Sequence, residues 1–483
     1  MNRHMIAYVL GRVMLAEAAL MAPSVVVGLI YREQVTDAFL LPIILLLSVG
    51  LLCGIRKPKN TVIFARDGFF IVAMAWIVMS LIGALPLWLC GGFASIWDCI
   101  FEIVSGFTTT GATVLSDPEA LPRCILFWRS FSHWIGGMGV LVFVLAIVPL
   151  SEDRSLHLMR AEVPGPVVGK LVPRMRNTAI ILYAVYSVLT VILIVLLLFG
   201  GMPLFDSLCH AFGAAGTGGF SVKTAGIGFY NSAYIDVVLG VFMVLFGVNF
   251  NLYYLILIRR VKEALKSEEL RWYVGIVLAS TAAIAVNVFS LYGNVGVSLQ
   301  HAFFQVSSII TTTGYATVDF AGDWPQFSQH VLVLLMIIGA CAGSTGGGLK
   351  VSRVVLLFKT FKQEFQQLIH PRAVSTVRMD GKPVENSALS SVRVYLAFYI
   401  AIICISTLLL SLDEFDFTTN VTAELACFNN IGPGLGMVGP LGNYAMYSPF
   451  SKVLLSLNML LGRLEIYPIL VLFSPKLWRG NVN

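Results

Sequence analysis

Apolar runs recur along this chain, separated by short polar segments that carry most of its charge. A bilayer core is about 30 Å thick, and a helix needs about 20 apolar residues to cross it. The pattern therefore predicts membrane-spanning helices. The first run continues into further spans and lacks a small-residue cleavage site, so we expect it to remain as a helix. Ten spans are expected, over residues 5–30, 38–55, 69–92, 124–150, 178–201, 233–258, 272–293, 330–361, 388–412 and 450–475.

A second pattern lies between paired spans. Four times, a span leads into a shorter semi-apolar segment, such as 95–107 or 297–310, then a glycine-centred turn and another span. Such segments are too short to cross a membrane, so each is expected to dip in and return. Internal repeats of this kind decide the fold. The predicted divisions are two leading helices in residues 1–60 and four repeats in 61–150, 151–258, 259–361 and 362–483.

The four turns align on one glycine each. The aligned residues are Thr109, Thr110, Gly111 and Ala112; Thr217, Gly218, Gly219 and Phe220; Thr312, Thr313, Gly314 and Tyr315; and Asn430, Ile431, Gly432 and Pro433. Each turn is followed by a span that returns to the same side, so the repeats run parallel. We predict an all-α membrane protein in which four parallel M1-P-M2 pore repeats surround a pseudo-fourfold axis, next to two N-terminal helices.

These turns suit a cation filter. A cation that leaves water must be coordinated again by oxygen, and rings of backbone carbonyls do this without burying formal charge. Glycine reaches positive φ without a side-chain penalty, and irregular backbone at membrane depth is tolerated where it lines water or is packed in protein. The alternative is that these small residues only let helices pack closely. Four aligned copies favour a potassium or other cation site at the turn residues.

A glycine-rich segment interrupts the apolar stretch over residues 330–361. It contains Gly343, Ser344, Thr345, Gly346, Gly347, Gly348 and Lys350. A phosphate-binding loop would have lysine after its last glycine and a strand before it, but here Leu349 follows Gly348 and no strand is predicted. We interpret the segment as a flexible gate in the membrane; the alternative is a passive kink.

Two ionisable side chains near membrane depth add to this interpretation. Lys350 ends the glycine-rich segment, and Arg463 lies with Glu465 in the last span. Ionisable residues in a membrane are costly and suggest a functional site. Arg463 is a candidate electrostatic barrier below the filter. The alternatives are an ion pair with Glu465 or an arginine that reaches the membrane surface.

Composition agrees with a membrane protein. Hydrophobic residues make up 57% of the chain and charged residues 12%, with a mean hydropathy of +0.84. The eight cysteines are scattered, and the histidines show no zinc-binding spacing. The sequence shows neither a nucleophile with a base nor a pair of acids that would indicate an enzyme. The net charge of +6 lies in short loops and not in a basic domain, which favours lipid headgroups or a cytosolic partner over nucleic acid.

The loop charges predict the orientation of the chain. By the positive-inside rule, basic loops and both termini are expected in the cytoplasm. The basic residues are Arg56, Lys57, Lys59 and Arg66; Arg154, Arg160, Lys170, Arg174 and Arg176; Arg259, Arg260, Lys262, Lys266 and Arg271; Lys359, Lys362, Arg372, Arg378 and Lys382; and Lys476 and Arg479. The opposite segments carry Asp98, Glu102, Asp117, Glu119, Asp206, Asp319, Asp323, Asp413, Glu414, Asp416 and Glu424. These acids are interpreted as a cation-attracting mouth or as solvated loop positions.

Several of these motifs together resemble the Trk/Ktr family of potassium-uptake proteins, specifically its TrkH/TrkG type. They are the four glycine turns, the segment from Gly343 to Lys350, Gly-Arg-Leu-Glu at 462–465 and Ala-Glu-Val-Pro-Gly-Pro at 161–166. The resemblance covers essentially the whole chain. The second and fourth turns depart from Thr-Thr-Gly, so the ring of turns is less symmetrical than that of a fourfold channel.

The resemblance implies potassium uptake across a bacterial inner membrane, with K⁺ as the transported ion and no covalent cofactor. It also implies a homodimer with one pore per subunit, bound to cytosolic nucleotide-binding regulatory subunits of the TrkA type. Gly111, Gly219, Gly314 and Gly432 would be the filter glycines, and Arg463 the gating arginine. A symporter that couples K⁺ to Na⁺ or H⁺ is the alternative. An alternating-access carrier for a larger solute would show two inverted halves.

Overall fold

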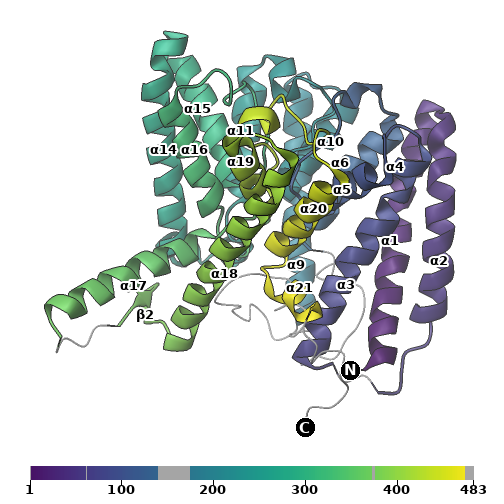
Figure 1. Ribbon diagram of the computed structural model, residues 1–483, viewed down its shortest axis with the longest axis horizontal. Helices are drawn as coiled ribbons and strands as arrows, with labels where there is room; N and C mark the ends of the chain where they lie inside the picture. The colour runs from purple at the N-terminus through teal and green to yellow at the C-terminus, as the bar shows by residue number, and fades with distance from the viewer. Residues whose placement is uncertain (1, 61–62, 140–174, 372–375, 474–483) are drawn as a thin grey trace.

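The computed structural model describes residues 2–60, 63–139, 175–371 and 376–473 of the 483-residue chain, and they are predominantly helical (Figure 1). The first helices are α1 (Arg3–Tyr31), α2 (Leu40–Gly54), α3 (Ala65–Gly83), α4 (Leu85–Leu89), α5 (Ile96–Phe107), α6 (Arg123–Gly137), α9 (Met175–Phe199), α10 (Leu204–Gly216), α11 (Ala233–Phe246), α12 (Phe250–Leu257) and α13 (Val261–Lys266). The others are α14 (Glu268–Tyr292), α15 (Val295–Ile310), α16 (Gln326–Ile338), α17 (Val351–Ile369), α18 (Asn386–Leu410), α19 (Phe417–Phe428), α20 (Pro449–Arg463) and α21 (Tyr467–Leu472).

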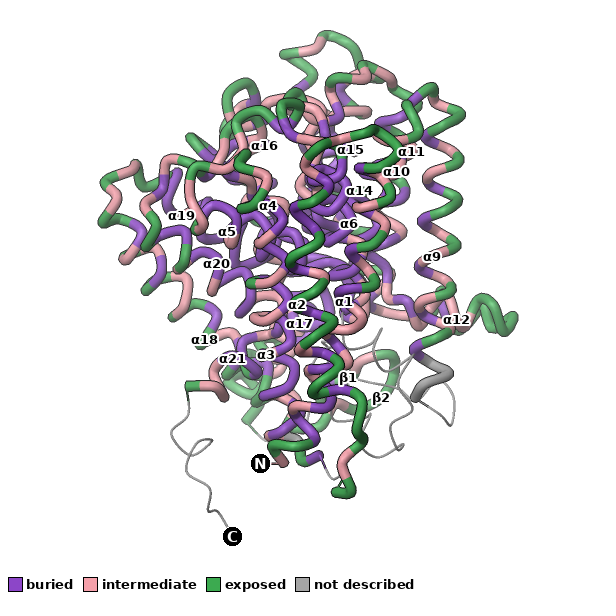
Figure 2. Tube along the Cα trace, turned by 90° about the vertical axis from the view of Figure 1, so that its right-hand side faces the viewer, coloured by how far each residue is buried: buried purple, intermediate pink, exposed green. Residues whose placement is uncertain are grey.

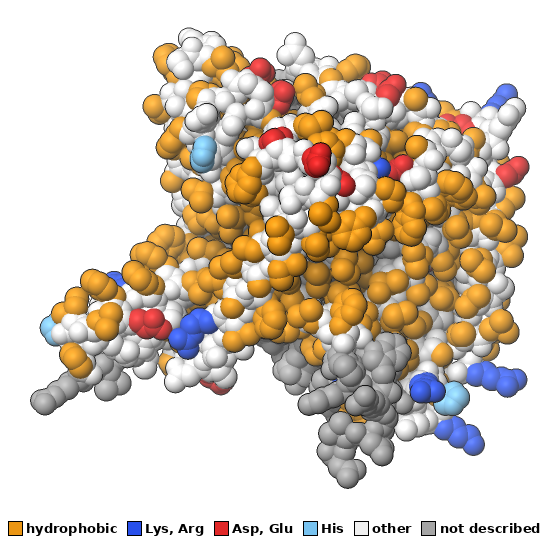
Figure 3. All heavy atoms as spheres, viewed as in Figure 1, with side chains coloured by type: hydrophobic (Ala, Val, Ile, Leu, Met, Phe, Trp, Pro, Cys, Tyr) orange, Lys and Arg blue, Asp and Glu red, His pale blue; other side chains and the backbone are white. Residues whose placement is uncertain are grey.

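Long apolar helices make this a multi-pass membrane protein. In the described residues, six stretches are long and apolar enough to cross a bilayer: Arg3–Tyr31, Gln34–Gly54, Arg66–Leu89, Ala179–Phe199, Glu268–Tyr292 and Asn386–Asp413. In Figure 3 an apolar band separates an upper end, with most of the visible Asp and Glu, from a lower end, with most of the visible Lys and Arg. Buried residues gather in the centre of the trace, while an outer helix such as α9 mixes buried, intermediate and exposed residues (Figure 2). The total of ten spans stays a prediction.

A short helix leads into each aligned glycine turn, as the sequence predicts. These helices are α5, α10, α15 and α19, and each follows a long helix: α3, α9, α14 and α18 respectively. All four short helices lie in the upper half of Figure 1. The four short helices therefore lie toward the same end of the molecule.

The helices that follow the turns are interrupted. α11 and α12 meet at 90° across a short break, so residues 233–258 form a bent pair of helices and not one continuous helix. The span predicted over 450–475 is also broken, because Glu465 and Ile466 adopt left-handed φ values of 53° and 68° between α20 and α21. The glycine-rich segment separates α16 from α17, which confirms the predicted interruption there.

Two of these interruptions support each other. The Phe250 N–H donates to the carbonyl of Gly343 at 3.0 Å, and the Cys341 N–H donates to that of Gly247 at 3.1 Å. The Thr345 hydroxyl donates to the carbonyl of Phe246 at 3.2 Å. Unpaired backbone groups are very costly inside a membrane, and these bonds satisfy them. The bend after α11 thus depends on a segment about a hundred residues away in the chain.

One small element departs from the all-α prediction. β1 (Arg378–Met379) pairs antiparallel with β2 (Lys382–Pro383). Asp380 and Gly381 join the strands with φ values of 50° and 77°, as a two-residue hairpin turn requires. Several predicted features lie outside the described residues: span residues 140–150, the loop 161–166, and Arg154, Arg160, Lys170, Arg174, Arg372, Lys476 and Arg479.

The leading helices give a test of close packing. A side chain added at Gly11 of α1 would lie 2.7 Å from the backbone nitrogen of Gly54 in α2, whereas one added at Gly275 of α14 would meet nothing within 4 Å. We expect Gly11→Ala to destabilise the protein by about 1–3 kcal/mol through overpacking, and Gly275→Ala to be neutral or stabilising. Thermal unfolding in detergent measures both, and equal melting temperatures would contradict the packing.

Candidate functional site

Each short helix ends in the same hydrogen-bonded turn. Thr110, Gly218, Thr313 and Ile431 each donate their N–H to the carbonyl five residues earlier, at 2.7–2.8 Å. The residue before each of them adopts a left-handed φ of 56–58°; these residues are Thr109, Thr217, Thr312 and Asn430. This is the Schellman arrangement that closes a helix carboxyl end. All four helices therefore direct the negative ends of their dipoles at the turns.

The glycine of each turn is also left-handed. Gly111, Gly219, Gly314 and Gly432 have φ values of 79°, 78°, 83° and 99°. In each turn, left-handed residues thus flank a residue without positive φ. Such alternation turns successive carbonyl groups toward one side and their N–H groups toward the other. An L side chain is strained at positive φ, so glycine is favoured at these four positions.

The four turns contact one another in a closed ring. A side chain added at Gly111 would collide with the carbonyl oxygen of Gly218, one at Gly219 with that of Thr313, and one at Gly314 with that of Ile431. One at Gly432 would lie 2.7 Å from the carbonyl oxygen of Thr110. Each glycine packs against the residue that precedes the glycine of the next turn. The contacts are equivalent and return to the first turn.

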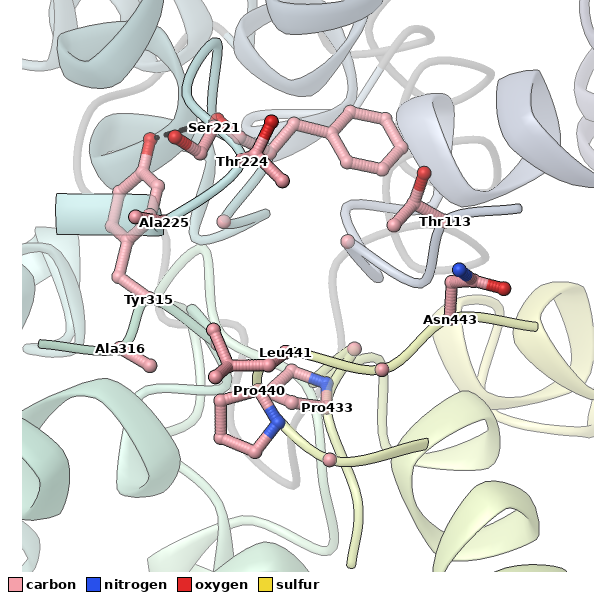
Figure 4. Close-up of a pocket in the computed structure, with 18 of the residues that line it drawn as sticks. Thr113, Ser221, Thr224, Ala225, Tyr315, Ala316, Pro433, Pro440, Leu441 and Asn443 are labelled. Atoms are coloured by element: carbon pink, nitrogen blue, oxygen red, sulfur yellow. Dashed lines mark hydrogen bonds between the residues drawn. The ribbon is translucent and has the colours of Figure 1, made fainter. Parts of the chain in front are cut away.

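All four glycines line one cavity of about 410 Å³. Figure 4 shows Thr113, Ser221, Tyr315 and Pro433, one from each repeat, around its open centre. The charged residues that line this cavity are Asp319, Asp323, Arg129 and Lys223. The aligned turns thus come together around a single space with both acidic and basic residues in its wall.

A buried ion pair supports the first two turns. Arg129 of α6 is 1% exposed and pairs with Glu102 of α5, which is 0% exposed. The Glu102 carboxylate accepts from the Thr113 hydroxyl and the Val114 N–H, both at 2.9 Å. Arg129 donates to the carbonyl of Ser221 at 3.1 Å. The pair therefore joins the segment after the first turn to the segment after the second.

Two tyrosines connect other neighbouring turns. The Tyr315 hydroxyl, from the third turn, donates to the carbonyl of Phe220 in the second at 3.3 Å. The Tyr444 N–H donates to the carbonyl of Thr113 beside the first turn, and its hydroxyl donates to that of Gly432 in the fourth, both at 2.8 Å. These bonds hold the outer ends of the turns together.

The acidic mouth expected from the sequence needs correction. Asp98, Glu102 and Glu424 are buried and have partners inside the protein. Asp98 pairs with Lys452 at 2.6 Å, and Glu102 pairs with Arg129. Glu424 accepts from the Asn458 amide at 2.8 Å. Asp319 and Asp323 are the acids from that set that line the cavity.

Glu119 lies near the rim of the same cavity. It pairs with the cavity-lining Lys223 at 2.9 Å, and this hydrogen bond lowers the pKa of the Glu119 carboxyl. Glu119 is therefore expected to stay ionised and to hold Lys223 at the edge of the cavity.

The glycine-rich segment lies beneath the turns. The Gly347 N–H donates to the Thr312 hydroxyl at 2.6 Å, on the side of the turn away from the large cavity. A second cavity of about 60 Å³ is lined by Gly343, Ser344, Gly346, Gly347, Lys350 and Arg463. Six of the eight predicted gate residues therefore line one narrow space, and Thr345 and Gly348 do not.

Arg463 spans this inner cavity. Its guanidinium donates to the carbonyls of Thr345 at 2.7 Å, Gly136 at 2.6 Å and Gly137 at 2.8 Å. Lys350 donates to the carbonyl of Gly346, and Glu465 pairs with Arg353 at 2.5 Å. Arg463 thus binds the glycine-rich segment to the end of α6.

Sequence reasoning missed Arg129 and Tyr444, and it placed Tyr315 in the third turn without its bond to the second turn. An arginine within the predicted span 124–150 was a usable signal, since an ionisable residue there suggests a functional site. Its partner Glu102 was interpreted as an outer acid. Among the described residues, no group of three or more His, Cys, Asp or Glu side chains is placed to hold a metal ion.

Comparisons with known proteins agree with this architecture. The family model TrkH, described as a cation transport protein, matches residues 35–482. The chain is 36% identical to the Trk system potassium uptake protein TrkG of Escherichia coli strain K12, over 95% of each chain. It is 37% identical to the Trk system potassium uptake protein TrkH of Salmonella typhimurium, over 97% of each.

A solved structure extends the similarity. The crystal structure of the potassium transporter TrkH from Vibrio parahaemolyticus matches with a TM-score of 0.89 and 32% identity, covering 99% of this chain and 100% of that one. Fold and site together define a multi-pass membrane transport protein with four turns around a common cavity. The chain belongs to the TrkH family of cation transport proteins.

The buried ion pair gives a test of the site's stability. In Glu102→Gln, Arg129 keeps a buried charge without its counter-ion, which is expected to cost about 3–5 kcal/mol. The matched variant Glu119→Gln alters a more exposed pair, for which about 0–1 kcal/mol is expected. Thermal unfolding of the purified proteins compares them. Equal losses in the two variants would contradict a supporting role for the buried pair.

Proposed function

We propose that this protein takes up potassium across the bacterial inner membrane through a channel-like pore. The ring of equivalent contacts among the four turns around one cavity carries this proposal. The family's potassium-uptake relatives support K⁺ as the transported ion. We assign the filter to the four aligned residues of each turn, from Thr109 to Ala112, Thr217 to Phe220, Thr312 to Tyr315 and Asn430 to Pro433.

The filter works by replacing the ion's water with carbonyl oxygens. Four helix carboxyl ends, each with a partial charge of about −0.5, direct negative potential at the turns. The carboxylates of Asp319 and Asp323 raise the local cation concentration in the outer cavity. A cation loses its hydration shell only where oxygens stand ready to replace it. A cation is thus attracted into the outer cavity first, and it then loses its water as the carbonyl oxygens of the turns coordinate it.

The glycine-rich segment and Arg463 form the proposed gate. The segment lies against the inner ends of the turns, and Arg463 holds it through the carbonyl of Thr345. A guanidinium beside a narrow cavity opposes the passage of cations, since like charges repel strongly at low dielectric. Opening requires Arg463 and the segment to move aside together.

The wider organisation follows the same proposal. Ten spans in two leading helices and four M1-P-M2 repeats, with the boundaries predicted from the sequence, would place basic loops and both termini in the cytoplasm. Cytosolic regulatory subunits of the TrkA type complete the proposed system, in line with the Trk system named in the relatives. We also propose a homodimer, which the family resemblance implies. Membrane lipids surround the apolar band, and no nucleic acid takes part.

Gly314 tests the filter. Serine at this position meets the carbonyl of Ile431 at a φ of 83°, so Gly314→Ser is expected to reduce potassium uptake at least tenfold or to lower the K⁺ to Na⁺ ratio. Gly293→Ser is the matched control, because Gly293 has a φ of 62° but its added side chain meets nothing within 4 Å. Uptake is measured in cells without other potassium systems. Wild-type rate and selectivity in Gly314→Ser would refute the filter.

Arg463 tests the gate. Arg463→Ala removes the charge and three hydrogen bonds, so we expect basal potassium flux to rise several-fold. Arg393→Ala is the control, because Arg393 is exposed and pairs with Glu364 at 3.2 Å. Flux into liposomes containing equal amounts of each variant is compared. Unaltered flux in Arg463→Ala would favour a purely structural role.

A further inference from the structure

The contacts between the glycine-rich segment and the filter involve two adjacent turns. Gly347 donates its N–H to the Thr312 hydroxyl of the third turn at 2.6 Å. A side chain added at Gly347 would collide with the carbonyl of Asn429 in the fourth repeat, and one at Gly346 would lie 2.9 Å from that of Thr311. The segment therefore packs against the inner ends of the third and fourth turns at once.

Other neighbouring turns are joined by their own side chains, and the Asn430 amide of the fourth turn also donates to the Thr110 hydroxyl of the first at 2.9 Å. Arg129 joins the first to the second, Tyr315 the second to the third, and Tyr444 the fourth to the first. Between the third and fourth turns, the bridging contact described above comes from the inner side. This contact is made by the glycine-rich segment, which must move when the proposed gate opens.

We propose that the glycine-rich segment also holds the third and fourth filter turns in register, and that Thr312 is the positioning residue that couples ion binding in the filter to the gate. This inference rests on the proposed function. When the segment withdraws, Thr312 loses its partner and the third turn loosens. The state of the gate then changes how well the filter binds K⁺.

The coupling must act in both directions. If opening the gate changes the affinity of the filter for K⁺, K⁺ in the filter changes the gate equilibrium by the same factor. The path is short. Arg463 binds Thr345, and Gly347 lies two residues further along the segment. A displacement at Arg463 therefore reaches Thr312 through very few bonds.

Thr109 holds the equivalent position in the first turn and offers a comparison. Its φ is 56° against 58° for Thr312, and both side chains are buried. The Thr109 hydroxyl has no hydrogen-bond partner in the described part of the chain, whereas Thr312 accepts from Gly347. Thr109→Val and Thr312→Val thus each remove a hydroxyl from the same type of backbone position. Only Thr312→Val breaks the hydrogen bond to Gly347 of the glycine-rich segment.

The experiment measures potassium flux into liposomes that contain the full chain, across a range of K⁺ concentrations. Thr312→Val is expected to raise basal flux and the half-saturating K⁺ concentration by about two- to tenfold, the effect of one hydrogen bond. Thr312→Ser keeps the hydroxyl and should restore both values. Thr190→Val removes a buried hydroxyl from α9, outside the four turns, and controls for general loss of packing.

Three results would overturn the inference: wild-type values in Thr312→Val, an equal rise in Thr109→Val, or no rescue by Thr312→Ser. If Thr312→Val fails to fold, Gly347→Ala replaces it, because the added methyl group would force the segment away from Asn429 and should raise basal flux in the same direction. Normal flux in Gly347→Ala would overturn the inference as well. A silent Thr312→Val beside an impaired Gly314→Ser refutes the coupling alone, whereas a silent Gly314→Ser refutes the proposed filter.

Discussion

The structure depends on one contact that occurs four times inside an apolar protein. In each turn, a glycine with a left-handed backbone packs against a carbonyl oxygen of the next turn. A turn of this kind leaves polar groups that a lipid environment cannot satisfy. Here each glycine rests on the backbone of the next turn, so none of the four is complete without its neighbours. Closure of the ring therefore needs all four turns.

The surrounding polar groups follow from that requirement. The turns would be loose if only short helices held them. Their outer ends are joined by the Glu102–Arg129 pair and by the hydroxyls of Tyr315 and Tyr444. Burying an ion pair usually gains little net stability, because desolvation offsets the attraction. Its value here is positional, since Arg129 reaches the second turn from a helix of the first repeat.

Much of this arrangement was predictable, because it follows from local patterns in the sequence. Apolar runs of membrane length, short segments before each turn and four aligned glycines are visible without coordinates, and α5, α10, α15 and α19 end where expected. The sharp bend between α11 and α12 was not predictable, since residues 233–258 read as one apolar run and the bend depends on bonds from Gly343 and Thr345. The Glu102–Arg129 pair was missed for the same reason: its members belong to different helices, and only folding brings them together.

Direct observation of a bound cation tests the central claim most sharply. Crystals grown with Rb⁺ or Tl⁺ in place of K⁺ would give anomalous scattering at any site that selects ions of this size. We predict a peak between the four turns, within coordination distance of main-chain carbonyls next to Gly111, Gly219, Gly314 and Gly432. Strong peaks elsewhere in the protein, with none between these turns, would contradict it.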